Sequence, residues 1–196
     1  MAPAQASLLA KLDTQERVRD FLTNAVASGR ASHAYLFLGA PGAGKLDAAW
    51  ALAQAFLCEQ DGCGACDSCV RVARHTHPDV HYYTPESATG YLIAQTRELL
   101  DDVPLAPIRA KAKVYIIDRA EQLRANTANA LLKTLEEPPE GVMFILLGTS
   151  ADVMLPTIVS RCQCVPFRLV SPTVAAQAVS LSLIHISEPT RHLRIS

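Results

Sequence analysis

An apolar segment that leads directly into a glycine-rich loop constrains the fold of this chain more than any other feature. Residues 34–38, Ala-Tyr-Leu-Phe-Leu, have the composition of a buried strand, and residues 39–45 follow as Gly-Ala-Pro-Gly-Ala-Gly-Lys. This loop matches G-x-x-x-x-G-K, in which backbone N–H groups surround phosphate oxygens and the lysine adds a positive charge. Residues 48–57 then show helical periodicity. The sequence therefore predicts the strand–loop–helix unit of a nucleotide-type α/β domain.

One position of the motif departs from the pattern. Leu46 stands where the motif has Ser or Thr, whose hydroxyl ligates magnesium beside a nucleotide. An isobutyl group cannot ligate a metal, so the sequence favours the fold over hydrolysis of ATP with magnesium, and it leaves open whether ATP and Mg²⁺ bind. The alternative is a loop kept only for its strand-to-helix geometry. The candidate phosphate-binding residues are Gly39, Gly42, Gly44 and Lys45.

Composition sets the broad class. The chain has 196 residues, of which 49% are hydrophobic and 19% charged, which is enough for one well-packed domain and part of another. Its formal net charge of -1 gives no general attraction for nucleic acid or an acidic membrane, so any DNA contact must be local or shared with partners. No apolar run approaches the ~20 residues of a membrane span, and residues 1–5 lack a signal-peptide pattern. We therefore expect a cytoplasmic protein without membrane contact.

Strand and helix patterns alternate along the chain. We expect helices over residues 14–28, 91–103, 126–137 and 156–161, and further strands over residues 80–84, 113–118, 142–147 and 162–167. In the second of these helices Leu92, Leu99 and Leu100 are expected to face inward. Alternating strands and helices predict an α/β fold in which a five-stranded parallel sheet is covered by helices on both faces.

A carboxylate is predicted at the end of the strand over residues 113–118. Asp118 lies at the carboxyl end of this strand, the edge at which open α/β sheets bind ligands. In P-loop ATPases such an Asp holds magnesium, and an acid directly after it polarises the attacking water. Here the next residue is Arg119, which cannot act as a base. Glu121 is the nearest acid but is expected to face elsewhere. Two interpretations of Asp118 stay open: a metal ligand, or a strand-end carboxylate that caps the next helix.

Four cysteines form a second motif within residues 58–69. They follow C-x4-C-x2-C-x2-C, and Gly62 and Gly64 permit the tight turns that let four thiolates converge. Disulfides at such short separations would be strained. The spacing predicts a small module with a structural zinc ion that has no open coordination position; the alternative is reduced free thiols. The predicted ligands are Cys58, Cys63, Cys66 and Cys69.

Together, these motifs resemble a known family. Residues 32–39, the four-cysteine insert, residues 130–139 (Ala-Leu-Leu-Lys-Thr-Leu-Glu-Glu-Pro-Pro) and residues 160–162 (Ser-Arg-Cys) are similar to bacterial replicative clamp-loader subunits of DNA polymerase III, which are of the AAA+ class. The resemblance covers nearly all of residues 12–169 and implies an AAA+ domain over residues 1–168. The implied partners are the other loader subunits (gamma/tau and delta) and, through the assembly, the sliding clamp and primer-template DNA.

Two residues indicate a branch of this family. The gamma/tau motor subunits carry Thr after the loop lysine and Glu after the strand Asp, whereas this chain has Leu46 and Arg119. The resemblance therefore favours the delta-prime type, a stator that is often non-hydrolysing. The alternative is an ATP-hydrolysing gamma/tau-like motor that uses Lys45 and Asp118. A third option, a zinc-knuckle nucleic-acid binder, would need more basic and aromatic residues beside the cysteines.

The family implies roles for two further residues. Arg161 corresponds to an arginine finger that reaches across a subunit interface to a neighbour's ATP, a role that suits a planar, permanent cation. The alternative is a salt-bridged arginine at a helix end. Thr149 corresponds to the polar residue that senses the γ-phosphate.

The end of the chain is expected to differ from the family. Residues 169–180 resemble the beginning of the family's helical lid. Residues 181–196, which include Leu-Ser-Leu-Ile-His-Ile-Ser-Glu-Pro-Thr-Arg, resemble a translated sequencing-library adapter. We therefore expect a truncated chain that lacks the rest of the lid and the collar domain; the alternative is a divergent natural tail.

Overall fold

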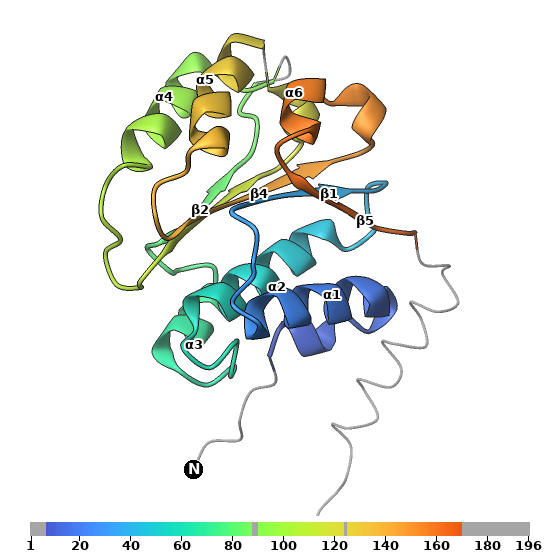
Figure 1. Cartoon of the computed structure of the whole chain (residues 1–196), viewed down its shortest axis with the longest axis vertical. Coiled ribbons are helices and arrows are strands. Elements are labelled where there is room, and N and C mark those ends of the chain that lie inside the picture. The colour runs from blue at the N-terminus through green and yellow to red at the C-terminus, as the bar shows by residue number, and fades with distance from the viewer. Residues whose placement is uncertain (1–6, 88–89, 124, 170–196) are drawn as a thin grey trace, which may run out of the picture.

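Five parallel strands form one sheet at the centre of the molecule (Figure 1). The computed structural model describes residues 7–87, 90–123 and 125–169. The strands are β1 (Ala34–Leu38), β2 (Val80–Tyr83), β3 (Lys113–Ile117), β4 (Val142–Gly148) and β5 (Gln163–Pro166), in the spatial order β2-β3-β4-β1-β5. Every neighbouring pair is parallel. The predicted five-stranded parallel sheet is confirmed.

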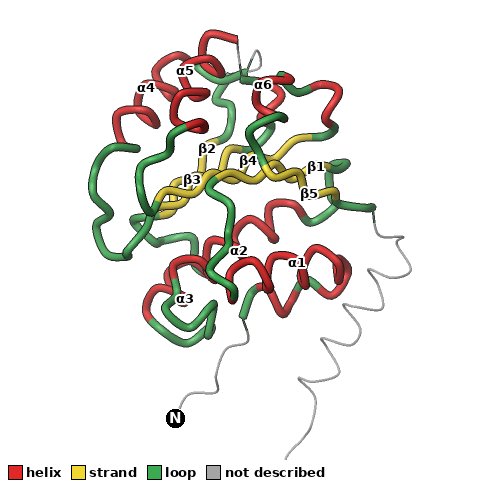
Figure 2. Tube along the Cα trace, viewed as in Figure 1, coloured by secondary structure: helices red, strands yellow, loops and turns green. Residues whose placement is uncertain are grey.

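Helices cover both faces of the sheet (Figure 2). One face carries α1 (Glu16–Ala27), α2 (Lys45–Leu57) and α3 (Asp67–Ala73), and the other carries α4 (Ile93–Asp102), α5 (Ala125–Glu136) and α6 (Pro156–Val159). Short 3₁₀ turns are η1 (Leu9–Lys11), η2 (Asp13–Gln15), η3 (Ala120–Gln122) and η4 (Ala151–Val153). Since successive strand residues point to opposite faces, β3 sends Val114 and Ile116 to one core and Tyr115 and Ile117 to the other.

The burial of the strands explains their order. Every residue of β3 and β4 is buried, as is expected of central parallel strands with helices on both faces. The edge strands β2 and β5 are partly exposed. With β1, β4 and β3 side by side, the carboxyl ends of all three meet at one edge of the sheet, where the loops that follow them converge.

The structure differs from the sequence analysis at one helix and at one side chain. The helix α3 was not predicted, because its seven residues lie within and just after the polar cysteine segment and carry too few apolar residues for a periodic signal. Leu92 was expected to face inward but is 42% exposed, because it is the extended N-cap of α4. The buried position is taken by Tyr91, whose hydroxyl donates to the carbonyls of Tyr83 and Asp118.

Some predictions concern segments that the structure does not describe. Residues 170–196, which hold most of the expected lid segment and the whole adapter-like tail, lie outside the described residues. Within the described ranges, none of the helices has both the length and the apolar character needed to cross a membrane.

Candidate phosphate-loop site and metal centre

The glycine-rich loop joins β1 to α2. Gly44 is the N-cap of α2 and Lys45 its first residue, so the backbone N–H groups at the start of this helix face the loop. Both Gly42 and Gly44 have φ of +81°, a left-handed conformation that residues with side chains rarely adopt. The loop therefore has the backbone form that the motif predicts, at the carboxyl edge of the sheet.

Lys45 is bound to its own loop. Its Nζ donates hydrogen bonds to the carbonyls of Gly39 and Ala40, the latter at 3.0 Å. Burial lowers the pKa of Lys45, and the nearby carboxylates of Glu121 and Asp118 act in the opposite direction. The ammonium group is thus placed within the loop and in the field of two acids.

Leu46 has a packing role. Its side chain is partly buried and packs against the core beneath α1 and α2. The position that offers a hydroxyl to magnesium in the motif is therefore filled by a hydrocarbon that packs against the core.

Asp118 is engaged by residues beside it and on β2. Its Oδ1 accepts the backbone N–H of Arg119 at 2.9 Å, and its Oδ2 accepts the Tyr82 hydroxyl at 3.4 Å. The Nε of Arg119 lies 3.8 Å from Oδ2, and the Arg119 guanidinium also donates to the Thr84 hydroxyl. Tyr82 lies on β2, on the far side of β3 from β1, while the charge of Asp118 also acts on Lys45 of the loop. The carboxylate thus bonds the N–H of the next residue and does not cap η3, which has no side-chain cap.

Glu121 lies nearer to the loop than the sequence suggested. The charge of Glu121 affects the pKa of Lys45 more than the charge of Asp118 does. A Cβ added to Gly148 would lie 3.6 Å from the Oε2 atom of Glu121. Gly148 ends β4, the strand between β3 and β1. The expectation that Glu121 faces elsewhere was therefore wrong. Arg119 has a left-handed φ of +46° and begins the η3 turn, which brings Glu121 back over the end of β4.

The structure separates the remaining two candidates. Thr149 follows β4 directly and is exposed, at the same edge of the sheet as the loop and Asp118. Arg161 lies two residues before β5, and Gln163 is paired with Tyr35 near the amino end of β1. The five residues of β1, about 16 Å of strand, therefore separate the level of Arg161 from the loop.

Arg161 is held by contacts at the end of α6. Its Nε donates to Glu136 Oε1 at 2.7 Å, and its other guanidinium nitrogens contact Glu136, the Thr157 carbonyl and the Ser160 hydroxyl. The side chain remains one-third exposed. The guanidinium is therefore oriented at the surface by an ion pair with α5.

The four predicted cysteines converge. Their sulfur atoms all lie within 4.8 Å of one another. The Sγ atom of Cys58 lies 3.7 Å from those of Cys63 and Cys66, and Cys63 Sγ lies 3.9 Å from Cys69 Sγ. A tetrahedral ion with metal–sulfur bonds of about 2.3 Å would space its ligands about 3.8 Å apart, so the cluster can hold a metal ion.

Backbone N–H groups support the sulfurs. Those of Ala65 and Cys66 lower the pKa of Cys63 to about 6, which favours the thiolate that a metal needs. Burial raises the pKa of Cys69. The Cys66 sulfur accepts the N–H of Cys69 at 3.4 Å and caps α3, so the metal-binding loop and this helix form one unit.

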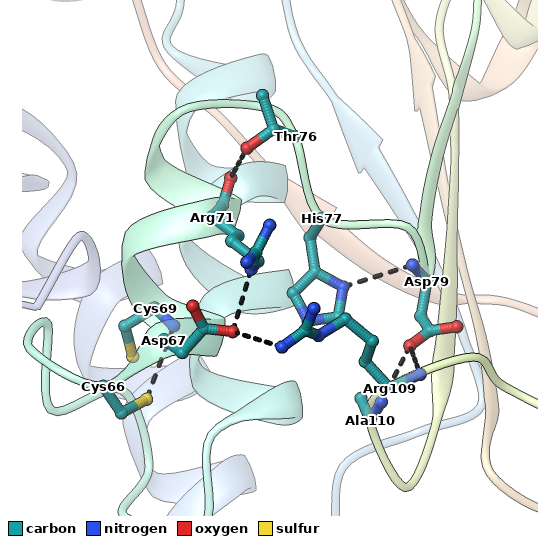
Figure 3. Close-up of polar contacts among 9 residues, drawn as sticks. All are labelled: Cys66, Asp67, Cys69, Arg71, Thr76, His77, Asp79, Arg109 and Ala110. Carbon is teal, nitrogen blue, oxygen red and sulfur yellow. Dashed lines mark hydrogen bonds and ion pairs between the residues drawn. The ribbon is translucent and has the colours of Figure 1, made fainter.

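A polar network joins this unit to the sheet (Figure 3). Asp67 Oδ2 accepts from Arg71 at 2.8 Å and from Arg109 at 3.2 Å. Arg109 belongs to a segment whose backbone N–H groups, over residues 108–110, donate to the fully buried carboxylate of Asp79. These N–H groups hold the pKa of Asp79 low, although burial alone would raise it. The segment leads into β3.

Comparison with known proteins assigns the chain to a class and then to a family. Among solved structures, a DNA polymerase III gamma subunit-related protein of Thermotoga maritima matches with a TM-score of 0.57 at 21% identity, over 79% of this chain and 47% of that one. The Thermotoga maritima RuvB Holliday junction branch migration motor matches with a TM-score of 0.54 at 18% identity, over 87% and 51%. The fold is therefore that of a P-loop AAA+ domain, with a four-cysteine insert.

Sequence relatives give the family. The family described as "DNA polymerase III, delta subunit" matches residues 14–171. The DNA polymerase III subunit delta' of Bacillus subtilis (strain 168) is 40% identical over 82% of this chain and 49% of its own length. The DNA polymerase III subunit tau of Escherichia coli (strain K12) is 43% identical over 76% of this chain and 23% of its own length. The chain belongs to the clamp-loader subunits of DNA polymerase III, and it spans about half or less of the length of these relatives.

Proposed function

We propose that the protein is a stator subunit of the delta-prime type, which presents Arg161 to the ATP of a neighbouring subunit in a DNA polymerase III clamp loader. The partners would be the gamma/tau and delta subunits and, through the assembly, the sliding clamp and primer-template DNA. The setting would be the cytoplasm, where replication proteins of bacteria act.

The placement of Arg161 carries this proposal. It lies at the edge of the sheet opposite its own phosphate loop, about 16 Å of strand away. A side chain so placed cannot serve the loop of its own domain, but it can reach a ligand that another subunit holds against this edge. Its ion pair with Glu136 limits the rotamers of a long side chain, so less entropy is lost when a phosphoryl oxygen becomes the guanidinium's acceptor.

The chain's own loop supports a non-hydrolysing role. Leu46 packs against the core and offers no oxygen to magnesium, and Arg119 replaces the acid that would activate water. Asp118 is already bonded to Arg119 and Tyr82. The glycine loop and Lys45 fit the phosphate groups of a nucleotide, but the donor set for its magnesium ion is incomplete, so we derive no catalytic step at this loop.

One observation favours the alternative, an ATP-hydrolysing gamma/tau-like motor. Glu121 reaches the end of β4 beside the loop, and its Oε2 is buried without a hydrogen-bond partner among the described residues. A carboxylate placed there is near where a water-activating base would act.

ATP turnover by the complete protein alone separates the two functions. The stator predicts no turnover above background, and no change on Lys45→Ala or Glu121→Gln. Glu140→Gln, at an exposed position, is the control and should not change turnover. Phosphate release that both Lys45→Ala and Glu121→Gln abolish would establish the motor function and contradict the stator function.

We further propose that the cysteine cluster holds a structural zinc ion. Four thiolates at tetrahedral spacing are the donor set that zinc prefers, and they leave no open position for a substrate. When bound, zinc would link the loop over residues 58–66 to α3.

A further inference from the structure

A buried glutamine joins two segments that are far apart in the sequence. Gln15 ends the η2 turn and is 8% exposed. Its Nε2 donates one hydrogen bond to the carbonyl of Ala43, within the phosphate loop, at 3.0 Å. The same nitrogen donates to the carbonyl of Arg168, just after β5, at 2.6 Å.

The same two segments also touch at the other end of the loop. The backbone N–H of Phe167 donates to the carbonyl of Leu38, the last residue of β1. A Cβ added to Gly39 would lie 2.7 Å from the carbonyl oxygen of Phe167, so only glycine permits this approach. The exit of β5 is therefore in contact with the first residue of the loop directly and with Ala43 through Gln15.

We propose that Gln15 is a positioning residue for the phosphate loop, which it fixes to the exit of strand β5. Its two amide hydrogens serve two carbonyls at once, so the loop and the chain that leaves the sheet at Arg168 keep one relative position. A displacement of the loop, by a bound phosphate or by a substitution, would then be passed to the exit of β5 at residues 167–169. This inference does not depend on the clamp-loader role.

The chemistry of the side chain makes the proposal specific. A primary amide nitrogen carries two hydrogens, whereas Met has a similar length and no donor, and Glu offers only acceptors beside two carbonyl oxygens. Loss of the donor would remove a hydrogen bond from the carbonyl of Ala43 and another from the carbonyl of Arg168.

The chain provides a matched control. Gln54 is 2% exposed and also bridges two segments, accepting the N–H of Leu8 and donating to the carbonyl of Cys69. Its partners are the N-terminal segment and α3, with no contact to the loop or to β5 among these bonds. Gln54→Met therefore creates the same kind of defect in the same core without touching the proposed link.

Residue-resolved amide hydrogen exchange of the 196-residue chain tests the proposal. We expect Gln15→Met and Gln15→Glu to raise exchange about fivefold or more at residues 42–44 and 167–169 together, while residues 114–117 in β3 keep their rates. Gln54→Met should leave exchange at residues 42–44 and 167–169 unchanged and raise it in α3. Unchanged exchange at either segment in the Gln15 variants, or the same change in Gln54→Met, would overturn the proposal.

A second measurement uses the unsubstituted chain, in case the variants do not fold. Exchange in low denaturant should show residues 42–44 and 167–169 opening with one common dependence on denaturant concentration, as one cooperative unit. Independent opening of the two segments would contradict the proposal.

Discussion

At the scale of a single residue, the Asp102 carboxylate binds side chains at the amino end of β3, far from the phosphate loop. Its Oδ2 accepts from the ammonium of Lys113 at 2.9 Å and from the hydroxyl of Tyr115 at 2.6 Å. Lys113 is only 2% exposed, so this carboxylate at the end of α4 is the counter-charge of a buried cation. Burial alone would raise the pKa of Asp102, but these hydrogen bonds hold it below its ordinary value.

We predict that Asp102→Asn lowers the free energy of unfolding by about 3 kcal/mol, because it leaves a buried ammonium without its counter-charge. Denaturant unfolding at neutral pH measures this, and Asp101→Asn, an exposed neighbour, should change it by less than about 0.5 kcal/mol.

The depressed pKa sets the sign of the pH dependence. The contribution of Asp102 is fully present above the ordinary aspartate value of about 3.9 and is lost as pH falls through the lower folded-state pKa. The parent protein should therefore lose more stability than Asp102→Asn in this acidic range, and equal losses would contradict the assignment.

Sequence patterns could predict those site residues that are close together in the chain. The loop glycines, Lys45 and the four cysteines are placed by short motifs, and the structure gathers each group as expected. Glu121 was misjudged because its direction depends on the left-handed Arg119 before it. Gln15 carried no signal, since its partners lie 28 and 153 residues away and are backbone carbonyls of unrelated segments.

At the scale of elements, the cysteine module and α3 form one unit, whose stability should depend on the metal. Cys66 is both a predicted ligand and the N-cap of α3. A seven-residue helix is too short to persist in water alone, so the metal and the packing of α3 on α2 must hold it.

We predict that the purified protein carries about one zinc ion per chain and that Cys66→Ser loses it, with faster amide exchange in α3. Elemental analysis and hydrogen exchange measure the two effects. Cys164→Ser, which removes an exposed thiol outside the cluster, is the control and should keep the metal. Protein that is metal-free as purified, and no less stable for it, would contradict the prediction.

Most helices and strands could be predicted because the spacing of apolar residues in the sequence matches the residues that each element buries. Each predicted strand is present, with its ends within two residues of those expected, and the three central strands β1, β4 and β3 are the continuous apolar runs typical of buried parallel strands. Helix α1 begins at Glu16 rather than Thr14, because the η2 turn precedes it. The exposed Leu92 shows the limit of this reasoning: a helical pattern does not show where the cap lies.

At the scale of the whole molecule, the carboxyl and amino ends of the strands carry different candidate functional residues. The carboxyl edge holds the phosphate loop, Asp118, Glu121 and Thr149, and its components for magnesium are incomplete. The opposite edge presents Arg161, oriented by Glu136. Under the proposed stator function, the edge with Arg161 is the one that would face a neighbouring subunit.

The most direct test is DNA-stimulated ATP hydrolysis by a clamp loader reconstituted with the complete protein. We predict that Arg161→Ala lowers hydrolysis at the neighbouring active site by about 1,000-fold without loss of assembly, and that Arg161→Lys does not restore it, because an ammonium lacks the planar fork. Arg97→Ala, an exposed arginine on α4, should leave the rate unchanged. Hydrolysis that is unaffected by Arg161→Ala in an intact loader would contradict the account.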